Sequence, residues 1–384
     1  MNVLRRLTDK VKVHFEKGKK LGFLHSSFEA FESFLFVPNS VTKRGVHIRD
    51  SYDLKRMMTA VILALVPTML FGMWNVGYQH TLATGTEMTY VAMFWFGFLK
   101  MLPMLIVSYV VGLGIEFISA EIKGHEVSEG FLVSGILIPL IMPIDIPLWI
   151  LAVSVAFAVI IGKEVFGGTG MNIWNPALIA RAFAFFAYPS HMSGDKVWVE
   201  GLVDGKGIDG FSGATPLANA QAGLDLPSVS DMFFGFIPGS VGETSTLAIL
   251  IGAAILIYTG VASWKIMFST VAGALLIGLL LNAIAPSPDS YLAIPAWHHL
   301  MLGGFAFGAV FMATDPVTAA QTETGKWVYG AMIGIIAVII RAFNPGYPEG
   351  MMLAILLMNT FAPLIDKIVV NTNIKRRLKR AVIK

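Results

Sequence analysis

The sequence contains no cysteine, and charged residues make up only 14% of its 384 positions. Without thiolates, this chain supplies no ligands for an iron–sulfur cluster or a cysteine-based zinc site, and it forms no disulfide bond. The formal net charge of +3 is too small to indicate a nucleic-acid partner. The first 50 residues also lack the apolar core of a cleaved signal peptide.

Apolar residues, by contrast, make up 55% of the chain and gather into runs long enough to cross a bilayer. Prolines such as Pro139, Pro143 and Pro316 interrupt some runs, and broken helices at membrane depth are tolerated only against protein or a polar cavity. The sequence therefore predicts an all-α polytopic membrane protein with about ten transmembrane helices, near residues 55–76, 91–120, 127–144, 147–163, 173–188, 244–263, 265–285, 296–313, 327–343 and 350–370.

The distribution of charge predicts an orientation. Of the 28 lysines and arginines, 12 lie before residue 57 and 7 lie after residue 366, so both termini are expected in the cytoplasm. The loop at 189–243 has seven acidic residues against two basic ones and is expected in the periplasm. Five spans on each side of it suggest an inverted repeat.

The predicted domain organisation follows from these spans. An amphipathic cytoplasmic arm at 1–52 alternates basic clusters with aromatic residues. It is followed by a five-helix repeat at 53–188, the periplasmic loop at 189–243, a second five-helix repeat at 244–370 and a basic cytoplasmic tail at 371–384.

A polar stretch within that loop, Ile208 to Leu217, presents the hydroxyl of Thr215. Gly210 and Gly213 lack a Cβ, so the stretch is predicted to be a flexible stalk over which the active site of a modifying enzyme can close. A hydroxyl in such a place suits attachment of a group through a phosphoester. The alternative is an ordinary surface turn, in which Ser212 and Thr215 make local backbone bonds.

A glycine-rich stretch, 163–176, joins two predicted spans and carries two amides, Asn172 and Asn175. The spacing of its glycines matches neither a Walker A loop nor a dinucleotide-binding motif. The amides are three residues apart at the mouth of a helix and therefore share a face. Because side-chain amides both donate and accept, they suit a neutral heterocycle. The alternative is that they cap the helix.

Ionisable residues inside the apolar spans are the remaining candidates, because burying a charge in the membrane is expensive. Glu116 lies within the second predicted span, and Asp315 and Asp366 lie at the ends of the eighth and tenth. Carboxylates suit a hard cation such as sodium, although each could instead form an interfacial cap or an ion pair. Arg181 and Arg341 lie within or at the ends of the fifth and ninth spans.

Taken together, these stretches resemble the B subunits of the sodium-translocating NADH:quinone oxidoreductases of bacterial membranes. The similarity runs from end to end and is carried by long stretches at residues 41–44, 47–51, 125–131, 163–189, 212–215, 237–240, 303–308, 344–351 and 373–377. Such long stretches are more specific than any short motif.

The resemblance implies that the segment Ser212, Gly213, Ala214 and Thr215 is a flavin site, in which a flavin transferase acting on FAD attaches FMN to Thr215 through a phosphoester. It also implies that Asn172 and Asn175 hold a noncovalent riboflavin. It further implies that the quinone substrate, ubiquinone or menaquinone, binds near the N-terminal arm and near Gly112, Leu113 and Glu116. The residues that match the family's sodium path are Glu116, Asp315 and Asp366. Where the family has two adjacent glycines, this chain has Gly112-Leu113, which alters the expected quinone pocket.

The resemblance further implies a multi-pass protein of the bacterial inner membrane, surrounded by lipid and assembled with five other subunits (A, C, D, E and F). Since the sequence has no soluble NADH-binding domain, NADH is expected to be oxidised on another subunit, and this chain alone is expected to be inactive. Two alternatives remain at this point: the related D subunit of the Rnf ferredoxin:NAD oxidoreductase, and a cofactor-free transporter or channel with its solute site in broken helices.

Overall fold

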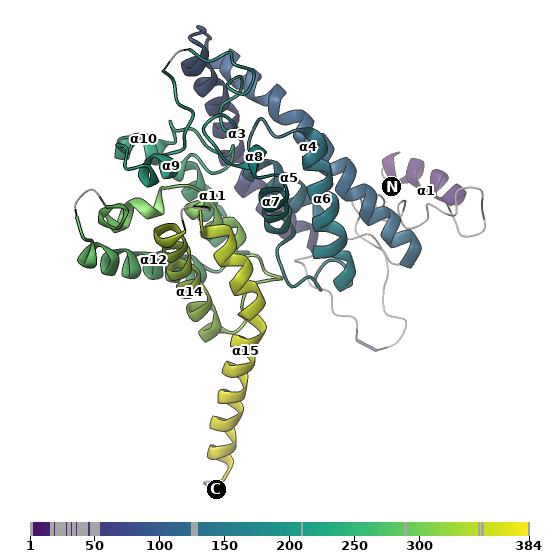
Figure 1. Ribbon diagram of the computed structural model, residues 1–384. Helices are drawn as coiled ribbons and strands as arrows, with labels where there is room; N and C mark the ends of the chain where they lie inside the picture. The colour runs from purple at the N-terminus through teal and green to yellow at the C-terminus, as the bar shows by residue number, and fades with distance from the viewer. Residues whose placement is uncertain are drawn as a thin grey trace.

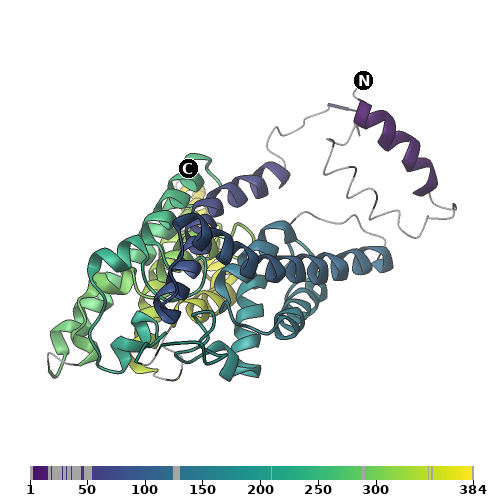
Figure 2. The same ribbon diagram turned by 90° about the horizontal axis from the view of Figure 1, so that it is seen from above.

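The computed structural model describes residues 3–15, 54–123, 130–208, 210–287, 290–344 and 349–382, with single positions at 19, 28, 32, 36, 45, 46 and 346. Within these residues the chain forms helices and no strand, which confirms the predicted all-α fold. The helices pack into one bundle, and α1 (Val3–Phe15) stands to one side of it in both views (Figure 1, Figure 2).

In the described part of the chain, each of the ten predicted spans corresponds to a helical segment. Six are long and apolar enough to cross a membrane: α3 (Leu54–Thr84), α4 (Tyr90–Lys123), α6 (Leu148–Gly162, continued by a 3-10 turn at Glu164–Phe166), α12 (Trp264–Ile284), α14 (Glu323–Phe343) and α15 (Met351–Val382). Four are short: α5 (Phe131–Ile141), α7 (Pro176–Ala187), α11 (Thr246–Tyr258) and α13 (Phe305–Phe307), which a π-helical turn at Gly308–Met312 extends. At about 1.5 Å per residue, none of these four crosses a hydrocarbon core of about 30 Å alone.

Some helices run beyond the predicted boundaries. Helix α15 continues through the predicted basic tail to Val382, and α3 extends to Thr84. The residues after 370 include several lysines and arginines, which are good helix formers, and no glycine or proline stops them. The tail is therefore a helical extension of the last span in this structure.

The packing of the helices corresponds to two sets of five, α3–α7 and α11–α15. Helix α4 packs on α6 as α12 packs on α14, and α6 packs on α7 as α14 packs on α15. The third member of each set is short and ends just before an aspartate, Asp145 or Asp315. The first pair differs, because α3 packs extensively on α4 whereas α11 packs mainly on α3. This pairing supports the five-plus-five organisation with broken helices.

The long loop between the two sets contains α8 (Pro189–Met192), α9 (Pro216–Gln221) and α10 (Val229–Phe234), and two 3-10 turns at Tyr291–Ala293 and Ala296–Leu300 follow later in the chain. In Figure 1, α9 and α10 lie toward the end of the bundle opposite the C-terminal end of α15. The loop is anchored to the end of α3, since Ile208 N donates to Ala83 O at 2.8 Å. It is thus a packed part of the fold.

The predicted N-terminal arm is only partly described. Helix α1 is present, and two contacts tie it to later residues: the rings of Phe15 and Phe28 stack at 4.7 Å, and Lys12 Nζ pairs with Glu32 Oε2 at 2.6 Å. The rest of the arm, and the matched residues 125–129, 345, 347 and 348, lie outside the described residues.

Candidate functional sites at two ends of the bundle

Thr215 lies at the start of α9, where its Oγ1 accepts a hydrogen bond from Ala218 N at 3.3 Å. Gly213 and Ala214 before it are buried, whereas Ser212 is exposed. A Cβ on Gly213 would overlap the backbone oxygen of Asp195, so this position requires glycine for close packing. The expectation of a free stalk is therefore wrong for Gly213 and Ala214, because their small size lets them pack against the loop.

Thr215 borders a cavity of about 410 Å³, which we call the Thr215 cavity. Its walls include the aromatic rings of Phe185 and Trp198. Further lining residues come from α7, α9, the loop after α8 and the segments before α11 and α15. They bring charged side chains into the wall: Arg181, Asp195, Glu243 and Glu349. The volume lies in the range of about 300–1,000 Å³ that is typical of pockets for small molecules and cofactors.

One wall of the Thr215 cavity holds a buried ion-pair network. Arg181, on α7, donates through NH1 to Glu243 Oε1 at 2.5 Å and through NH2 to Glu349 Oε2. Burial raises the pKa of Glu243 to about 8, while the charge of Arg181 acts in the opposite direction. The sequence flags Arg181 through its position in an apolar span, but no local signal marks Glu243 or Glu349.

Asn172 and Asn175 lie directly before α7, and both are buried. Asn175 is the N-cap of α7: its Oδ1 accepts from Ala177 N at 2.9 Å, and Pro176 occupies the first helical position. Its Nδ2 donates to Asp315 Oδ2 at 3.2 Å, and Asn172 Nδ2 donates to Trp174 O at 3.0 Å. The capping alternative thus holds for Asn175, which also reaches the second set of helices.

A smaller cavity of about 80 Å³, the Asn175 cavity, is lined by Asn172, Asn175, Asp315 and Lys163. The structure therefore brings three of the predicted site residues together. Asp315 is held from several sides, because Val317 N donates to its Oδ1 at 3.1 Å and Thr318 Oγ1 donates to its Oδ2 at 3.0 Å.

Glu116 is joined to this cavity through Lys163, which follows the end of α6. Lys163 Nζ donates to Glu116 Oε1, and each of the two side chains is only 4% exposed. The other oxygen, Glu116 Oε2, is buried and has no hydrogen-bond partner within the described residues. Lys163 is a site residue that sequence reasoning did not single out; a lysine directly after an apolar run was the available signal.

The other predicted quinone residues lie on the same helix as Glu116. Gly112 is buried against the ring of Phe131, with which a Cβ at position 112 would overlap, and Leu113 is partly exposed on the neighbouring face of α4. None of these three residues lines the Thr215 cavity or the Asn175 cavity.

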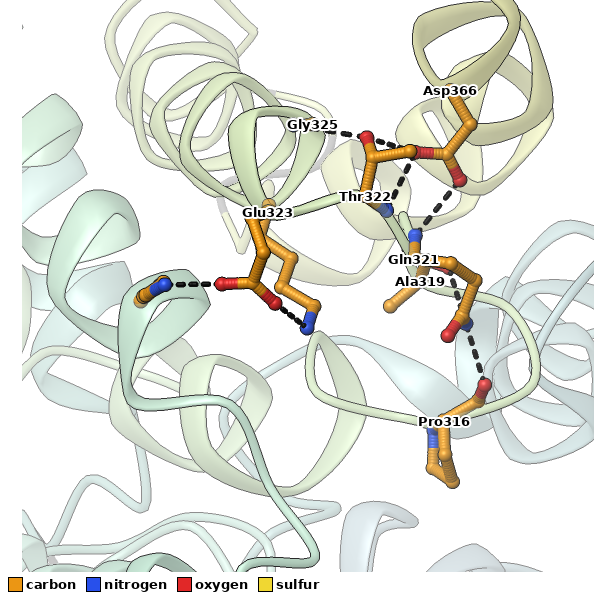
Figure 3. A network of polar contacts seen from close by, with 9 residues as sticks. Pro316, Ala319, Gln321, Thr322, Glu323, Gly325 and Asp366 are labelled. Carbon is orange, nitrogen blue, oxygen red and sulfur yellow. Dashed lines mark hydrogen bonds and ion pairs between the residues drawn. The ribbon is translucent and has the colours of Figure 1, made fainter. Parts of the chain in front are cut away.

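Asp366 lies apart from the Asn175 cavity and caps the start of α14 (Figure 3). Its Oδ2 accepts from Gln321 N at 2.8 Å, and its Oδ1 accepts from Thr322 N at 2.9 Å and from Thr322 Oγ1 at 2.6 Å. Thr322 is itself the N-cap of α14 and accepts from Gly325 N at 3.1 Å. Asp366 therefore ties α15 to the first turn of α14.

Comparisons with known proteins show which family the chain belongs to. A family model described as the NQR2, RnfD, RnfE family matches residues 41–375. The B subunit of the Na(+)-translocating NADH-quinone reductase of Ectopseudomonas mendocina is 47% identical over 408 aligned residues, covering 99% of this chain and 100% of that protein. The corresponding protein of Chromohalobacter salexigens is 46% identical over 403 aligned residues, covering 98% of this chain and 96% of that protein. The chain therefore belongs to the NQR2, RnfD, RnfE family.

Proposed function

We propose that this chain is the membrane subunit of a Na⁺-translocating NADH:quinone reductase and carries FMN on Thr215 through a phosphoester bond. The observation that carries the proposal is the position of Thr215 at the edge of a cavity of about 410 Å³. Relatives that are named as B subunits of that reductase align over nearly the whole chain, which supports the same assignment.

The residues around Thr215 fit a flavin. Phe185 and Trp198 offer aromatic surface to a flat ring system, while Arg181 and Gln221 offer polar groups to its edge. A flavin supplies one- and two-electron redox chemistry when bound, and the protein contributes binding, orientation and electrostatics. In this proposal a flavin transferase uses FAD to attach FMN to the hydroxyl of Thr215.

We extend the proposal to a noncovalent riboflavin at the Asn175 cavity. The amides of Asn172 and Asn175 and the ammonium of Lys163 suit the polar edge of such a heterocycle. The cavity of about 80 Å³ is smaller than a typical ligand pocket, so binding requires the glycine-rich segment before Asn172 to move outward.

Helix α7 connects the two cavities. Asn175 begins this helix beside the Asn175 cavity, and Arg181 lies six residues later in the wall of the Thr215 cavity. Six residues of helix rise about 9 Å. Two redox groups in these cavities would thus lie along one helix, half of whose residues are buried, and the short separation favours electron transfer between them.

The proposed path runs from the FMN on the periplasmic side, through riboflavin, to quinone near Gly112, Leu113 and Glu116, with both termini in the cytoplasm. The carboxylates of Glu116, Asp315 and Asp366 are proposed for the sodium path. The partners are the remaining subunits (A, C, D, E and F), which oxidise NADH and complete the complex.

Fluorescence of the denatured protein tests the attachment. After denaturing electrophoresis of the complex, the band of this chain should fluoresce under ultraviolet light, and the band of a Thr215→Ala variant should not. A wild-type band without fluorescence, from cells that contain the transferase, would exclude the covalent flavin. It would favour a cofactor-free transporter instead.

The same family model also covers Rnf-type proteins. A separate test must therefore distinguish a quinone reductase from an Rnf-type ferredoxin:NAD oxidoreductase. The 46–47% identity to the B subunits of quinone reductases over almost the full length favours the quinone enzyme. Purification of the complex, followed by assays of NADH oxidation with quinone or with ferredoxin, separates the two.

A further inference from the structure

A buried ion-pair network lies in the wall of the Thr215 cavity, and its local contacts do not explain why it is there. Arg181 comes from α7, Glu243 from the loop before α11 and Glu349 from the segment before α15. The three side chains are 4%, 6% and 12% exposed, respectively, and all three line the cavity. Three segments far apart in sequence therefore bring their charges to one wall.

The structure fixes the two carboxylates closely. A Cβ on Gly304 would lie 2.6 Å from Glu349 Oε1 and 2.7 Å from Glu243 Oε1, so only glycine leaves room for both oxygens. Arg341 secures the backbone behind Glu349, because its guanidinium donates to Glu349 O at 2.9 Å, His299 O at 2.7 Å and Leu302 O at 2.8 Å. The group contains two arginines and two glutamates, and because burial raises the pKa of Glu243 to about 8, its charge depends on the proton of Glu243.

Stability alone is a weak reason for such a network. Replacing buried ion pairs with apolar side chains of similar volume is often neutral or stabilising, because desolvation offsets the attraction. Two polar atoms in this wall, Thr244 Oγ1 and Glu349 Oε1, are moreover buried without a hydrogen-bond partner among the described residues. Buried unsatisfied polar atoms are uncommon in proteins, and a ligand is one established reason for them.

We propose that Arg181, held between Glu243 and Glu349, stabilises negative charge on the flavin that Thr215 carries. The inference rests on the proposed function, because it requires a flavin in the Thr215 cavity. A flavin held there would become more negative by one charge on accepting one electron, derived from NADH through the partner subunits, without a proton. A fixed guanidinium in a wall of low dielectric constant favours that charge without reorganisation, and the flanking carboxylates oppose it. The balance among the three side chains sets the reduction potential.

Two substitutions with opposite expected effects test this assignment in the intact complex. Arg181→Gln removes the positive charge and should lower the ratio of reduced to oxidised covalent flavin about tenfold at a given potential, which corresponds to about 59 mV for a one-electron couple. Glu349→Gln keeps the shape but removes a negative charge, so the potential should rise. A merely structural network has no reason to shift the potential in opposite directions.

The readout is a potentiometric titration followed by flavin absorbance. Subtraction of the Thr215→Ala complex isolates the flavin on Thr215 from the others. Lys100→Gln is the matched control, because Lys100 forms an ion pair with Glu200 on the same side of the molecule but does not line the cavity. The reduction potential of the covalent flavin in the Lys100→Gln complex should equal that in the wild type.

The outcomes separate the two proposals. A fluorescent band with unchanged potentials in both charge variants, or shifts of the same sign, would overturn the role of Arg181 while leaving the covalent flavin in place. Absence of a fluorescent band in the wild type would instead overturn the proposed function. If Arg181→Gln does not assemble, Arg181→Lys, which keeps the charge and should retain the potential, is compared with Glu349→Gln.

Discussion

The Thr215 cavity and the Asn175 cavity differ in size and in charge, although α7 connects them. The first has a volume of about 410 Å³ and a wall in which Arg181 is flanked by two glutamates, whereas the second has about 80 Å³ and contains Lys163, Asp315 and two amides. A covalently attached cofactor needs a cavity beside the residue that carries it. A noncovalent ligand can be accommodated by a segment that moves. Under the proposed function, the contrast means that the two sites would hold their ligands by different means, and each prediction below tests part of it.

The largest expected effect is the complete loss of covalent flavin in Thr215→Ala, since no phosphoester can form without the hydroxyl. Noncovalent flavin extracted by denaturation should remain at the wild-type level, because the Asn175 cavity is unchanged. The measurement is in-gel fluorescence together with flavin extraction. Ser230→Ala, which removes an exposed hydroxyl in the same loop outside the cavity wall, is the control and should keep its fluorescent band; loss of both flavins in Thr215→Ala would mean that the sites are not independent.

Next in size is the effect of Lys163→Gln on stability. The substitution leaves Glu116 buried and charged without its partner, and breaking such a pair typically destabilises a protein by about 3–5 kcal/mol. Denaturant unfolding of the detergent-solubilised protein measures the change. The double variant Lys163→Gln, Glu116→Gln should recover much of the loss. An exposed pair serves as control: Lys206→Gln, which breaks the contact with Asp204 at 3.0 Å, should leave stability almost unchanged.

Substitution of Asn175 distinguishes capping from ligand binding. Asn175→Ala should remove the cap, at a cost of about 1 kcal/mol, and weaken noncovalent flavin binding at least tenfold, or about 1.4 kcal/mol. Asn175→Ser restores a capping oxygen but not the amide, so stability should return while flavin binding stays weak. If flavin content recovers in Asn175→Ser, the amide has no direct role in binding.

Asp366→Asn should have a smaller effect. The amide can still accept through one oxygen, but its nitrogen cannot accept from Gln321 N or from Thr322, so the link between α15 and α14 loses about 1 kcal/mol. Because the carboxylate is already engaged by these donors, the sodium concentration for half-maximal quinone reduction should change less than in Glu116→Gln. A larger change in Asp366→Asn would place Asp366 on the sodium path ahead of Glu116.

The last prediction depends on pH and concerns the loop on the Thr215 side, at Asp145. Burial, followed by the hydrogen bond and charge of Glu200, raises the pKa of Asp145 from 3.8 to about 8, while Lys100 lowers it and Asp204 raises it. The folded protein therefore keeps a proton that the unfolded chain releases, and stability should fall as pH rises from about 4 to about 8. The interactions of Glu200 with Asp145, Lys100 and His80 lower its pKa, although burial raises it, so its contribution has the opposite sign.

Unfolding measured across this pH range in wild type and Asp145→Asn checks the effect of Asp145. The variant should show a shallower decline with pH, since its amide does not titrate. The burial-raised pKa of Glu243 contributes a decline of the same sign in both proteins, so the difference between the two curves is the relevant quantity. Parallel curves would contradict the assignment to Asp145.

Hydrophobic run length was sufficient to predict the all-α fold and the order of the ten helical segments. Prolines marked the third and eighth spans, α5 and α13, as broken. Run length could not predict that α7 and α11 are short, because an apolar run continues through a turn that is buried against protein. At the sites, sequence placed Thr215 in a polar loop and Asn175 at a helix start. It could not pair Lys163 with Glu116 or bring Glu243 and Glu349 to Arg181, since those contacts join residues separated by 47, 62 and 168 positions.

The most direct test is the mass of the proteolytic peptide that contains Thr215, taken from the complex made in cells with an active flavin transferase. The proposed function predicts a peptide heavier by one esterified FMN, with the added mass located on Thr215 by fragmentation. An unmodified threonine in that peptide, in a complex that reduces quinone with NADH, would contradict it.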